Sequence, residues 1–418
     1  MDSETLDLGA LRIDMERLKT NLRALAEIGR GADHGIYRMG FTDADIEARR
    51  WFMETARQAG LSARMDSAGN VFAKAPEADD APVVLTGSHL DSVVSGGTLD
   101  GALGVLVALE CLQTVRDAGI ELSHPLEAVG FADEEGRFGG MFGSQAFCGE
   151  ITPETILSSL DLDGVKLEDE LRRHGMDPML ALEARRDPGQ LHAFVELHVE
   201  QGPVLDRYGK PVGVVEAITG LVRWTVRLIG MPNHAGTTPM NLRDDAFMGL
   251  ADFAHEIPRV LDENGGELSR ATVGKVEIRP GSANTIPGEV EFSLDFRDTS
   301  SDVLDDLEEA FRRALSAIAR RRNLRFEFDP VSRIAPVECH PELVELIGAQ
   351  AAALGLDAMR MPSGAAHDAQ MLAKVTRTGM IFVPSKDGQS HSPSEWTALD
   401  DIEAGANLAL RSLIQLAG

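Results

Sequence analysis

The sequence predicts an α/β protein in which one large domain is interrupted by an inserted α+β module. The chain has 418 residues, more than one ordinary hydrophobic core holds, so two domains are expected. Strand and helix patterns alternate in the N-terminal part, as in an α/β fold. Between residues 217 and 330 the order becomes strand–helix–strand–strand–helix–strand, which is the order of a ferredoxin-like module.

Hydrophobic periodicity predicts the individual elements of the N-terminal part. Apolar residues recur at three- and four-residue steps over 11–29, which indicates a helix, and a second helix begins with the acidic residues at 43–47. Short apolar runs predict buried strands at 70–74, 82–87 and 126–131. The continuous apolar stretch at 101–115 predicts a buried helix.

The inserted module follows from a second set of patterns. Strands are expected at 221–229, 272–278, 289–297 and 323–328, and helices at 240–261 and 302–322. The strand at 289–297 alternates, and its inward residues are Val290, Phe292, Leu294 and Phe296. Arg297 therefore lies on the polar face, where an arginine can clamp a carboxylate, although a solvated surface arginine is the simpler alternative.

The candidate metal ligands lie on both sides of this module and none lies inside it. Residues 1–216 and 331–418 are therefore expected to form one discontinuous domain, with 217–330 inserted into it. We find no internal repeat in the sequence.

Composition excludes several classes of function. The net charge of −27 argues against nucleic-acid binding, which needs a basic surface. No run approaches the ~18 apolar residues of a membrane span, and the N-terminus lacks the apolar core of a signal peptide. Three cysteines without CxxC spacing indicate reduced thiols instead of a disulfide framework, so a cytoplasmic location is expected.

Histidines and acidic residues at strand ends and in glycine-bordered loops form a candidate metal site: His89, Asp100, Glu134, Glu135, His198 and His391. This mixture suits zinc or a similar divalent ion, and a bridging carboxylate would let two ions lie roughly 3.5–4 Å apart. The segments GSHLDS and DEEG directly follow predicted strands, where open α/β sheets place their sites. Each residue alone has a simpler explanation, as a capping aspartate, part of an exposed acidic turn or a polar histidine. Their combination favours metal binding.

Local context suggests separate roles for these residues. Asp91, two residues after His89, is expected to hold the ring of that histidine through its second nitrogen. Glu134 and Glu135 are adjacent and point in different directions, so one can bind metal while the other faces the substrate water as a general base. Asp100 lies before Gly101, whose backbone freedom suits a bridging carboxylate.

Five segments of this chain resemble signatures of the peptidase M20 superfamily: GSHLDSVVSGGTLDGALGV, FADEEGRFGGMFGS, ELHVEQGPVLD, GMPNHAGTTPM and HSPSEWT. Within it the chain resembles the amidase/hydantoinase/carbamoylase branch, from about Gly29 to the C-terminus. The resemblance implies a dinuclear-metal catalytic domain with a central mixed β-sheet flanked by helices. It also implies that the inserted domain forms the interface of a homodimer.

The resemblance further implies specific residue roles. One ion would be held by His89, Asp100 and His198, and Asp100 would bridge to a second ion bound also by Glu135 and His391. Glu134 becomes the general base, and His234 would reach the site of a partner subunit and stabilise the oxyanion. The substrate would be held by Gln201, Asn284, Arg297 and the backbone at Ala366. The ions would be Zn, Mn, Co or Ni, and a cis peptide is expected after Asp100.

The implied reaction is hydrolysis of a linear amide or ureido C–N bond near a carboxylate. The favoured substrates are N-carbamoyl-L-amino acids, which give an L-amino acid, CO2 and NH3. Two departures from the family pattern leave the identity of the substrate undecided: Ala366 stands where the family mostly has glycine, and the segment EEGRFGG is shortened relative to common members. Alternatives are allantoate or another ureido acid (including the β-ureidopropionase substrate), an N-acyl amino acid or peptide, and a metal-binding scaffold without turnover. His198 speaks against a peptidase, because many peptidase relatives use a carboxylate there, and the intact Glu134 speaks against a scaffold.

Overall fold

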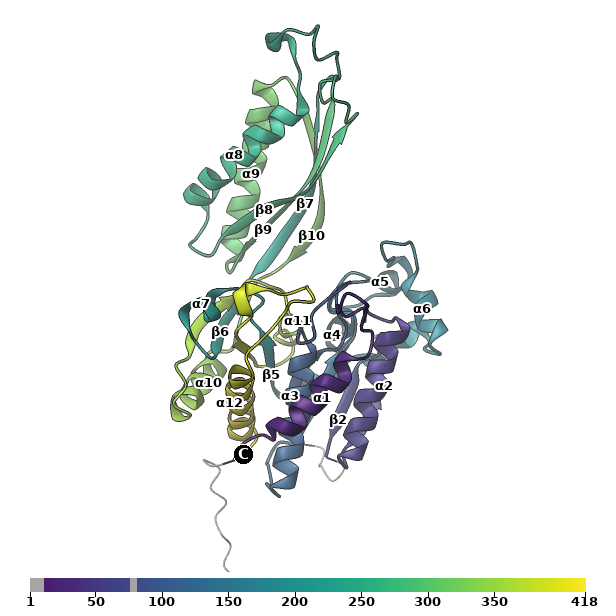
Figure 1. Cartoon of the computed structure of the whole chain (residues 1–418), viewed down its shortest axis with the longest axis vertical. Helices are drawn as coiled ribbons and strands as arrows, with labels where there is room; N and C mark the ends of the chain where they lie inside the picture. Colours follow the sequence, from purple (N-terminus) through teal and green to yellow (C-terminus); the bar gives the residue numbers. More distant parts are fainter. Residues whose placement is uncertain (1–10, 76–80) are drawn as a thin grey trace, which may run out of the picture. The chain divides into compact units, whose positions relative to one another are not determined.

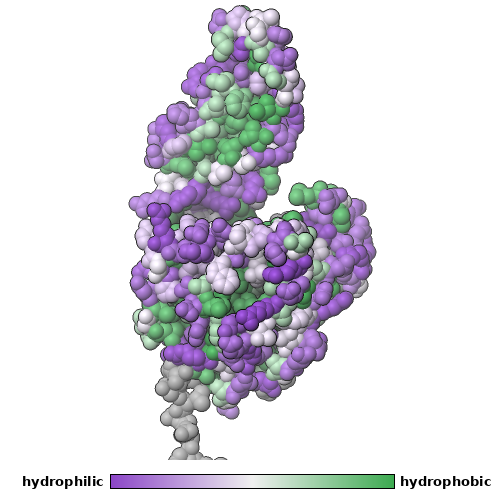
Figure 2. All heavy atoms as spheres, viewed as in Figure 1, coloured by the Kyte–Doolittle hydropathy of each residue, from purple (hydrophilic) through white to green (hydrophobic). Residues whose placement is uncertain are grey.

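The structure is a computed structural model that describes residues 11–75 and 81–418. The chain divides into two compact units, Met1–Glu216 with Cys339–Gly418 and Ala217–Glu338 (Figure 1). The first is called the larger unit and the second the smaller unit. Hydrophilic side chains are spread over the visible surface of each, as expected for a net charge of −27 (Figure 2).

The larger unit is built on a mixed sheet, which among the described residues has nine strands. Eight of them follow the order β1-β2-β4-β3-β5-β13-β6-β11, and β12 pairs with β6. Their bounds are β1 Ser62–Met65, β2 Val71–Lys74, β3 Val83–His89, β4 Leu126–Phe131, β5 Leu191–Val199, β6 Gly213–Ile218, β11 Val337–Glu338, β12 Met359–Ser363 and β13 Thr378–Val383. The pairs β4–β3, β3–β5 and β5–β13 are parallel, so these four strands point the same way.

Helices cover this sheet (Figure 1). The α-helices are α1 Met15–Ala26, α2 Asp43–Gln58, α3 Ala102–Asp117, α4 Phe142–Cys148, α5 Pro153–Ser158, α6 Leu167–Arg173, α7 Val204–Tyr208, α10 Pro341–Ala353, α11 Asp368–Leu372 and α12 Leu399–Ala417. The short 3₁₀ turns are η1 Pro178–Ala184, η2 Pro188–Gln190 and η4 Lys386–Gly388. Helix α3 is buried from Ala102 to Val115 and packs on β3, β4 and β5. Strands β3 and β4 are buried along their whole length and are mostly apolar, as expected for central strands covered on both faces.

The smaller unit is a four-stranded antiparallel sheet with two helices. Its elements are β7 Gly220–Ile229, η3 Met240–Leu242, α8 Ala246–Asn264, β8 Arg270–Arg279, β9 Glu289–Asp298, α9 Ser301–Arg321 and β10 Arg325–Ile334. The strand order is β10-β7-β9-β8, which is the arrangement of a ferredoxin-like module. Strands β7 and β9 alternate between buried and more exposed residues, and their apolar faces pack against α8 and α9.

The mixed α/β architecture and the order of elements in the module are as predicted, and the differences have physical causes. Strand β5 is buried from Ala193 to Val199, and helices α3, α11 and α12 pack against it. Strands β1, β11 and β12 were not predicted, since they are short and carry no apolar pattern. Helix α8 begins later than expected, where Asp245 accepts the backbone N–H groups of Phe247 and Met248.

Within the part of the chain that the structure describes, no helix combines the length and the apolar character that a bilayer span requires.

A buried ion pair fastens the end of β4. Arg49 and Asp45, both in α2, are fully buried, and Arg49 Nε donates to Asp45 Oδ2 at 3.0 Å. The same guanidinium donates to the carbonyl oxygens of Gly69, Gly130 and Phe131 at 3.1–3.2 Å. Since Phe131 is the last residue of β4, Arg49 fixes the position from which the DEEG segment departs.

We expect Arg49→Met to lower the free energy of unfolding by about 3–5 kcal/mol, because the Asp45 carboxylate is then buried without its partner. Arg50→Met is the matched control: Arg50 is exposed in the same helix, and a change within about 0.5 kcal/mol is expected there. Urea unfolding followed by far-ultraviolet circular dichroism measures both. Equal destabilisation by the two substitutions would contradict the role given to Arg49.

Candidate metal centre

Four neighbouring parallel strands deliver the predicted ligands to one edge of the larger unit's sheet. His89 is the last residue of β3, and His198 lies next to the end of β5. Glu134 and Glu135 follow β4, and the loop that carries His391 follows β13. Because the carboxyl ends of parallel strands meet at the same edge, residues far apart in sequence come together there.

A first group consists of His89, Asp100 and His198, all buried, with ligand atoms within 4.8 Å of one another. Asp100 Oδ1 lies 3.6 Å from His89 Nε2 and 3.2 Å from His198 Nε2. The Nδ1 atoms of the two rings lie 3.0 and 2.8 Å from the backbone oxygens of Asp91 and Val199. With these nitrogens donating to carbonyls, both Nε2 atoms are directed at the Asp100 carboxylate, and a proton or a bound cation between them satisfies the arrangement.

A second group consists of Asp100, Glu135 and His391. His391 Nε2 lies 3.3 Å from Asp100 Oδ2 and 3.4 Å from Glu135 Oε2. Glu135 Oε1 is buried and has no hydrogen-bond partner among the described residues. Asp100 thus presents one oxygen to each group, as a carboxylate that bridges two cations does. The donor set and the orphaned oxygen fit divalent metal.

Glu134 stands beside the first group without belonging to it. Its Oε2 lies 3.7 Å from His89 Nε2. The backbone N–H groups of Glu134 and Glu135 donate to the two carboxylate oxygens of Asp91 at 3.2 and 3.1 Å. Asp91 also contacts the second nitrogen of the His89 ring, as expected: its backbone carbonyl lies 3.0 Å and its carboxylate Oδ1 3.8 Å from Nδ1. The same carboxylate fixes the DEEG turn, a contact that the sequence did not predict.

The electrostatics of the site follow from crowding acids in a buried place. Burial raises the pKa of Glu134 well above its usual range, and Glu135 and Asp368 add to this effect. Burial and the charge of Asp100 raise the pKa of Glu135 to about 7. Burial would also raise the pKa of Asp100, but hydrogen bonds from the imidazoles hold it well below its usual range. Buried carboxylates therefore outnumber the nearby positive groups, and this favours the binding of cations in the site.

Glycine is required next to Asp100. Gly101 has φ +61°, and a Cβ atom there would lie 2.4 Å from the His89 ring. Its backbone N–H donates to His198 Nε2 at 3.2 Å. The expected cis peptide after Asp100 was wrong: among the described residues only Arg279–Pro280 is cis. The left-handed turn at Gly101 already presents the carboxylate to both histidines.

Sequence reasoning missed Glu395, although it lies in the HSPSEWT segment. Its Oε1 accepts the backbone N–H groups of Leu99 and Asp100 at 2.9 and 3.0 Å. Ser390 Oγ donates to Glu395 Oε2 and contacts Asp100 Oδ2, both at 3.0 Å. Glu395 therefore holds the loop that positions Asp100. The HSPSEWT motif could have indicated Glu395, but only His391 was selected from it as a site residue.

His367 was also missed. It belongs to a third buried group with Glu196 and His198, and its ring lies edge-on to that of His198 at 4.5 Å between centroids. Its Nε2 pairs with Ser363 Oγ at 2.9 Å, and Glu196 accepts from Ser88 Oγ at 2.6 Å. Burial and the neighbouring His198 hold the pKa of His367 well below its usual range. These satisfied contacts make the residue a support for His198.

The proposed substrate residues fall in both units. In the larger unit, Gln201 Nε2 lies 2.8 Å from Asp100 Oδ2 and 3.2 Å from His391 Nε2. Ala366 is partly buried directly before His367. The smaller unit contains His234, Asn284 and Arg297.

Two loops of the smaller unit bring His234 and Asn284 together. The backbone N–H of Ala235 donates to the carbonyl of Asn284 at 2.9 Å. His234 Nδ1 accepts from the backbone N–H groups of Gly236 and Thr237 at 3.1 and 3.3 Å. The ring proton is therefore on Nε2, and this exposed imidazole offers a donor.

Comparisons with known proteins decide the family. The model of peptidase family M20/M25/M40 matches residues 85–415. The chain belongs to this family. The N-carbamoyl-L-amino acid amidohydrolase of Geobacillus stearothermophilus is 40% identical over 409 residues, which cover 97% of this chain and 99% of that protein.

Two further relatives agree. The allantoate amidohydrolase of Bacillus subtilis is 35% identical, over 94% of this chain and 95% of that protein. A solved amidase of the hydantoinase/carbamoylase family from Burkholderia multivorans has a TM-score of 0.89 at 37% identity, covering 98% of this chain and 99% of that one. The predicted family, fold class and hydrolase class are thereby confirmed, and the M20 relationship together with the two ligand groups makes the chain a metallohydrolase.

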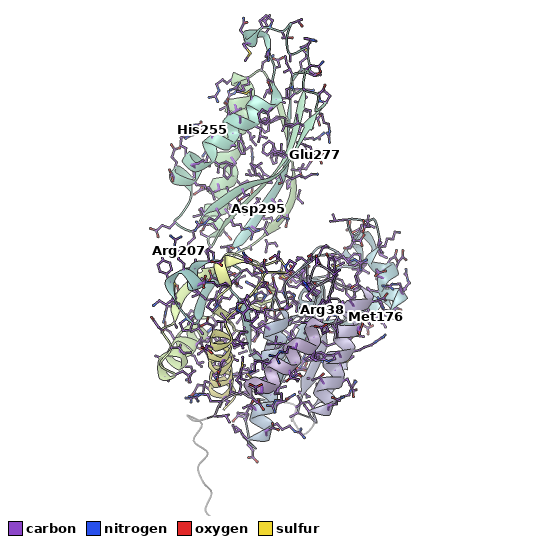
Figure 3. The ribbon with its side chains drawn as sticks, in the orientation of Figure 1. Arg38, Met176, Arg207, His255, Glu277 and Asp295 are labelled. Atoms are coloured by element: carbon purple, nitrogen blue, oxygen red, sulfur yellow. The ribbon has the colours of Figure 1, made fainter. Side chains whose placement is uncertain are left out.

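We expect His391→Ala to bind about one divalent ion fewer per chain than the unsubstituted protein, because the second group loses its imidazole. Asp100→Ala should lose ions from both groups, since its carboxylate is shared. His255→Ala, which removes an exposed imidazole from α8, is the control and should retain full metal content (Figure 3). Elemental analysis after dialysis measures the ratio; equal loss in His255→Ala and His391→Ala would refute the assignment.

Proposed function

We propose that this protein hydrolyses N-carbamoyl-L-amino acids to L-amino acids, CO2 and NH3. The observation that carries the proposal is the buried carboxylate of Asp100 shared by two ligand groups, with the free carboxyl of Glu134 beside them. Relatives named for this reaction match nearly the whole chain.

Two divalent ions would be held in the site, with Zn, Mn, Co or Ni all suited to the donors. His89, Asp100 and His198 would hold one, and Asp100, Glu135 and His391 the other. A divalent ion bound there supplies Lewis acidity, which polarises a carbonyl and lowers the pKa of water.

Glu134 is suited to move the proton. Its carboxyl lies next to the candidate ligands. The hydrogen bonds that fix the DEEG turn run from backbone N–H groups to Asp91 and do not involve this carboxyl. Burial raises the pKa of Glu134, so the group can accept a proton from water and return it to the leaving nitrogen.

The remaining substrate contacts are assigned to His234, Asn284, Arg297, Gln201 and the backbone at Ala366. Arg297 offers a planar fork to the substrate carboxylate. The Nε2–H of His234 is a suitable donor to the oxyanion, and we propose that a partner subunit supplies it in a homodimer formed through residues 217–330. The buried, free cysteines Cys111, Cys148 and Cys339 support the expectation of the reducing cytoplasm.

A second candidate is hydrolysis of allantoate or another ureido acid, favoured by the relatives of that name. A panel of ureido acids, N-acetyl amino acids and dipeptides separates the candidates. Ammonia and amino acid release is measured after the metal is stripped and each ion is added back. Turnover of the N-acetyl amino acids or dipeptides alone would overturn the proposal.

We expect Glu134→Gln to retain metal and to lose about 10²–10⁴-fold in kcat, the range for loss of a general acid–base. Glu135→Gln should instead bind less metal, because Glu135 is a ligand. Metal content and kcat are measured on the same samples. If both variants lost metal equally, the roles assigned to the two residues would be wrong.

We expect His234→Ala and Glu134→Ala to be inactive as separate homodimers and to regain turnover when mixed. In the mixed dimer one site has both an intact Glu134 and a His234 from the other chain. Heterodimer formation is verified with two affinity tags before activity is measured. Heterodimers without turnover would show that His234 acts within its own chain or not at all.

A further inference from the structure

The smaller unit carries a basic groove on the open face of its sheet. The groove has a volume of about 520 Å³, and its charged lining consists of Arg223, Arg270, Lys275, Arg297 and Asp295. Figure 3 marks Asp295 on β9 and Glu277 on the adjacent β8. Lys275 pairs with Glu277 at 2.7 Å, which leaves three arginines around the carboxylate of Asp295, a local excess of positive charge in a chain with a net charge of −27.

The strand register places two arginines opposite each other. Arg270 of β8 pairs directly with Arg297 of β9. Residues opposite each other on an antiparallel pair have Cβ atoms about 4.5–5.5 Å apart and share a face, and like charges there are destabilising. The buried neighbour Phe296 confirms that Arg297 is on the face away from the core. An anion bound between the two guanidinium groups reduces the repulsion between them.

Asp295 neutralises only part of this charge. It accepts from Arg297 Nε at 2.9 Å and from Arg223 Nη2 at 2.8 Å, so two arginines share one carboxylate. Arg270 has a different environment. Its Nη1 donates to the backbone oxygens of Glu267 and Ser269 at 3.0 and 2.8 Å, and among the described residues no carboxylate pairs with it. These carbonyls orient the guanidinium without cancelling its charge.

Resting on the proposed function, we propose that Arg270 is a specificity-determining residue for substrates with two carboxylates. Arg297 binds the α-carboxylate and Arg270 binds a carboxylate at the end of the substrate side chain. Two opposed planar forks are suited to a diacid, because each guanidinium can engage one carboxylate in two hydrogen bonds. A monoacid leaves Arg270 without a counter-ion. The substrate class is therefore N-carbamoyl-L-glutamate or N-carbamoyl-L-aspartate.

An isosteric substrate pair tests this inference: N-carbamoyl-L-glutamate against N-carbamoyl-L-glutamine. The unsubstituted enzyme is expected to prefer the glutamate compound. Arg270→Gln should lower kcat/KM for that compound by about tenfold or more, chiefly through KM, as expected for loss of a charge-assisted hydrogen bond. The loss with the glutamine compound should be much smaller, and Arg270→Lys should recover part of the preference.

Arg325→Gln is the matched control. Arg325 is exposed on the opposite edge strand β10 and is not part of the groove, so its loss removes the same charge from the same sheet. This variant should keep the preference for glutamate over glutamine. Equal losses on both substrates in Arg270→Gln, or a changed preference in Arg325→Gln, would overturn the inference.

Calorimetric titration with L-glutamate and L-glutamine separates failure of this inference from failure of the proposed function. Binding of L-glutamate that depends on Arg270, in a protein that turns over no ureido acid, would reject the proposed reaction and retain the diacid site. Turnover of neutral ureido acids with no Arg270-dependent selectivity would reject the diacid site alone. Sulfate that binds the groove as tightly as L-glutamate, with no discrimination between the substrates, would reduce the groove to an inorganic-anion site and overturn the inference.

Discussion

The carboxylate of Asp100 facing three imidazoles is the interaction on which the site depends. His89 and His198 approach one of its oxygens and His391 approaches the other, at 3.2–3.6 Å. A buried carboxylate is costly unless positive charge faces it, either on protonated imidazoles or on bound cations. The surrounding chain is arranged to hold this carboxylate in place, through the turn at Gly101 and the hydrogen bonds from its loop to Glu395.

The larger unit's sheet makes this arrangement possible. Parallel β3, β4, β5 and β13 end at one edge, and each is followed by a polar segment. The strands themselves are apolar and buried, so they act as a rigid frame. Arg49 fixes the last residues of β4, and Asp91 then accepts the N–H groups of the glutamate pair. The two glutamates can therefore take different roles although they are adjacent in sequence.

The two faces of the smaller unit's sheet have different characters. One face of its sheet is a hydrophobic core closed by α8 and α9, and the other face is free to carry charge. Side chains alternate between the two faces along the same strand, so Phe296 packs in the core while Arg297 lies on the charged face beside Asp295. In a strongly acidic chain, this face is a local concentration of positive charge, which the proposed acidic substrate requires.

The sequence by itself determined the α/β class, the ferredoxin-like order of the insertion and the polar face of Arg297, because periodicity and chain order are local properties. Motifs also selected the six candidate site residues that the structure brings together, since glycine-bordered turns after apolar strands are visible in sequence. The tertiary structure alone decided the contact of Glu395 with Asp100, 295 residues away, and the hydrogen bonds from the glutamate pair to the Asp91 carboxylate. It also decided that Arg270 faces Arg297, because strand register is fixed by packing across the whole sheet and not by either strand alone.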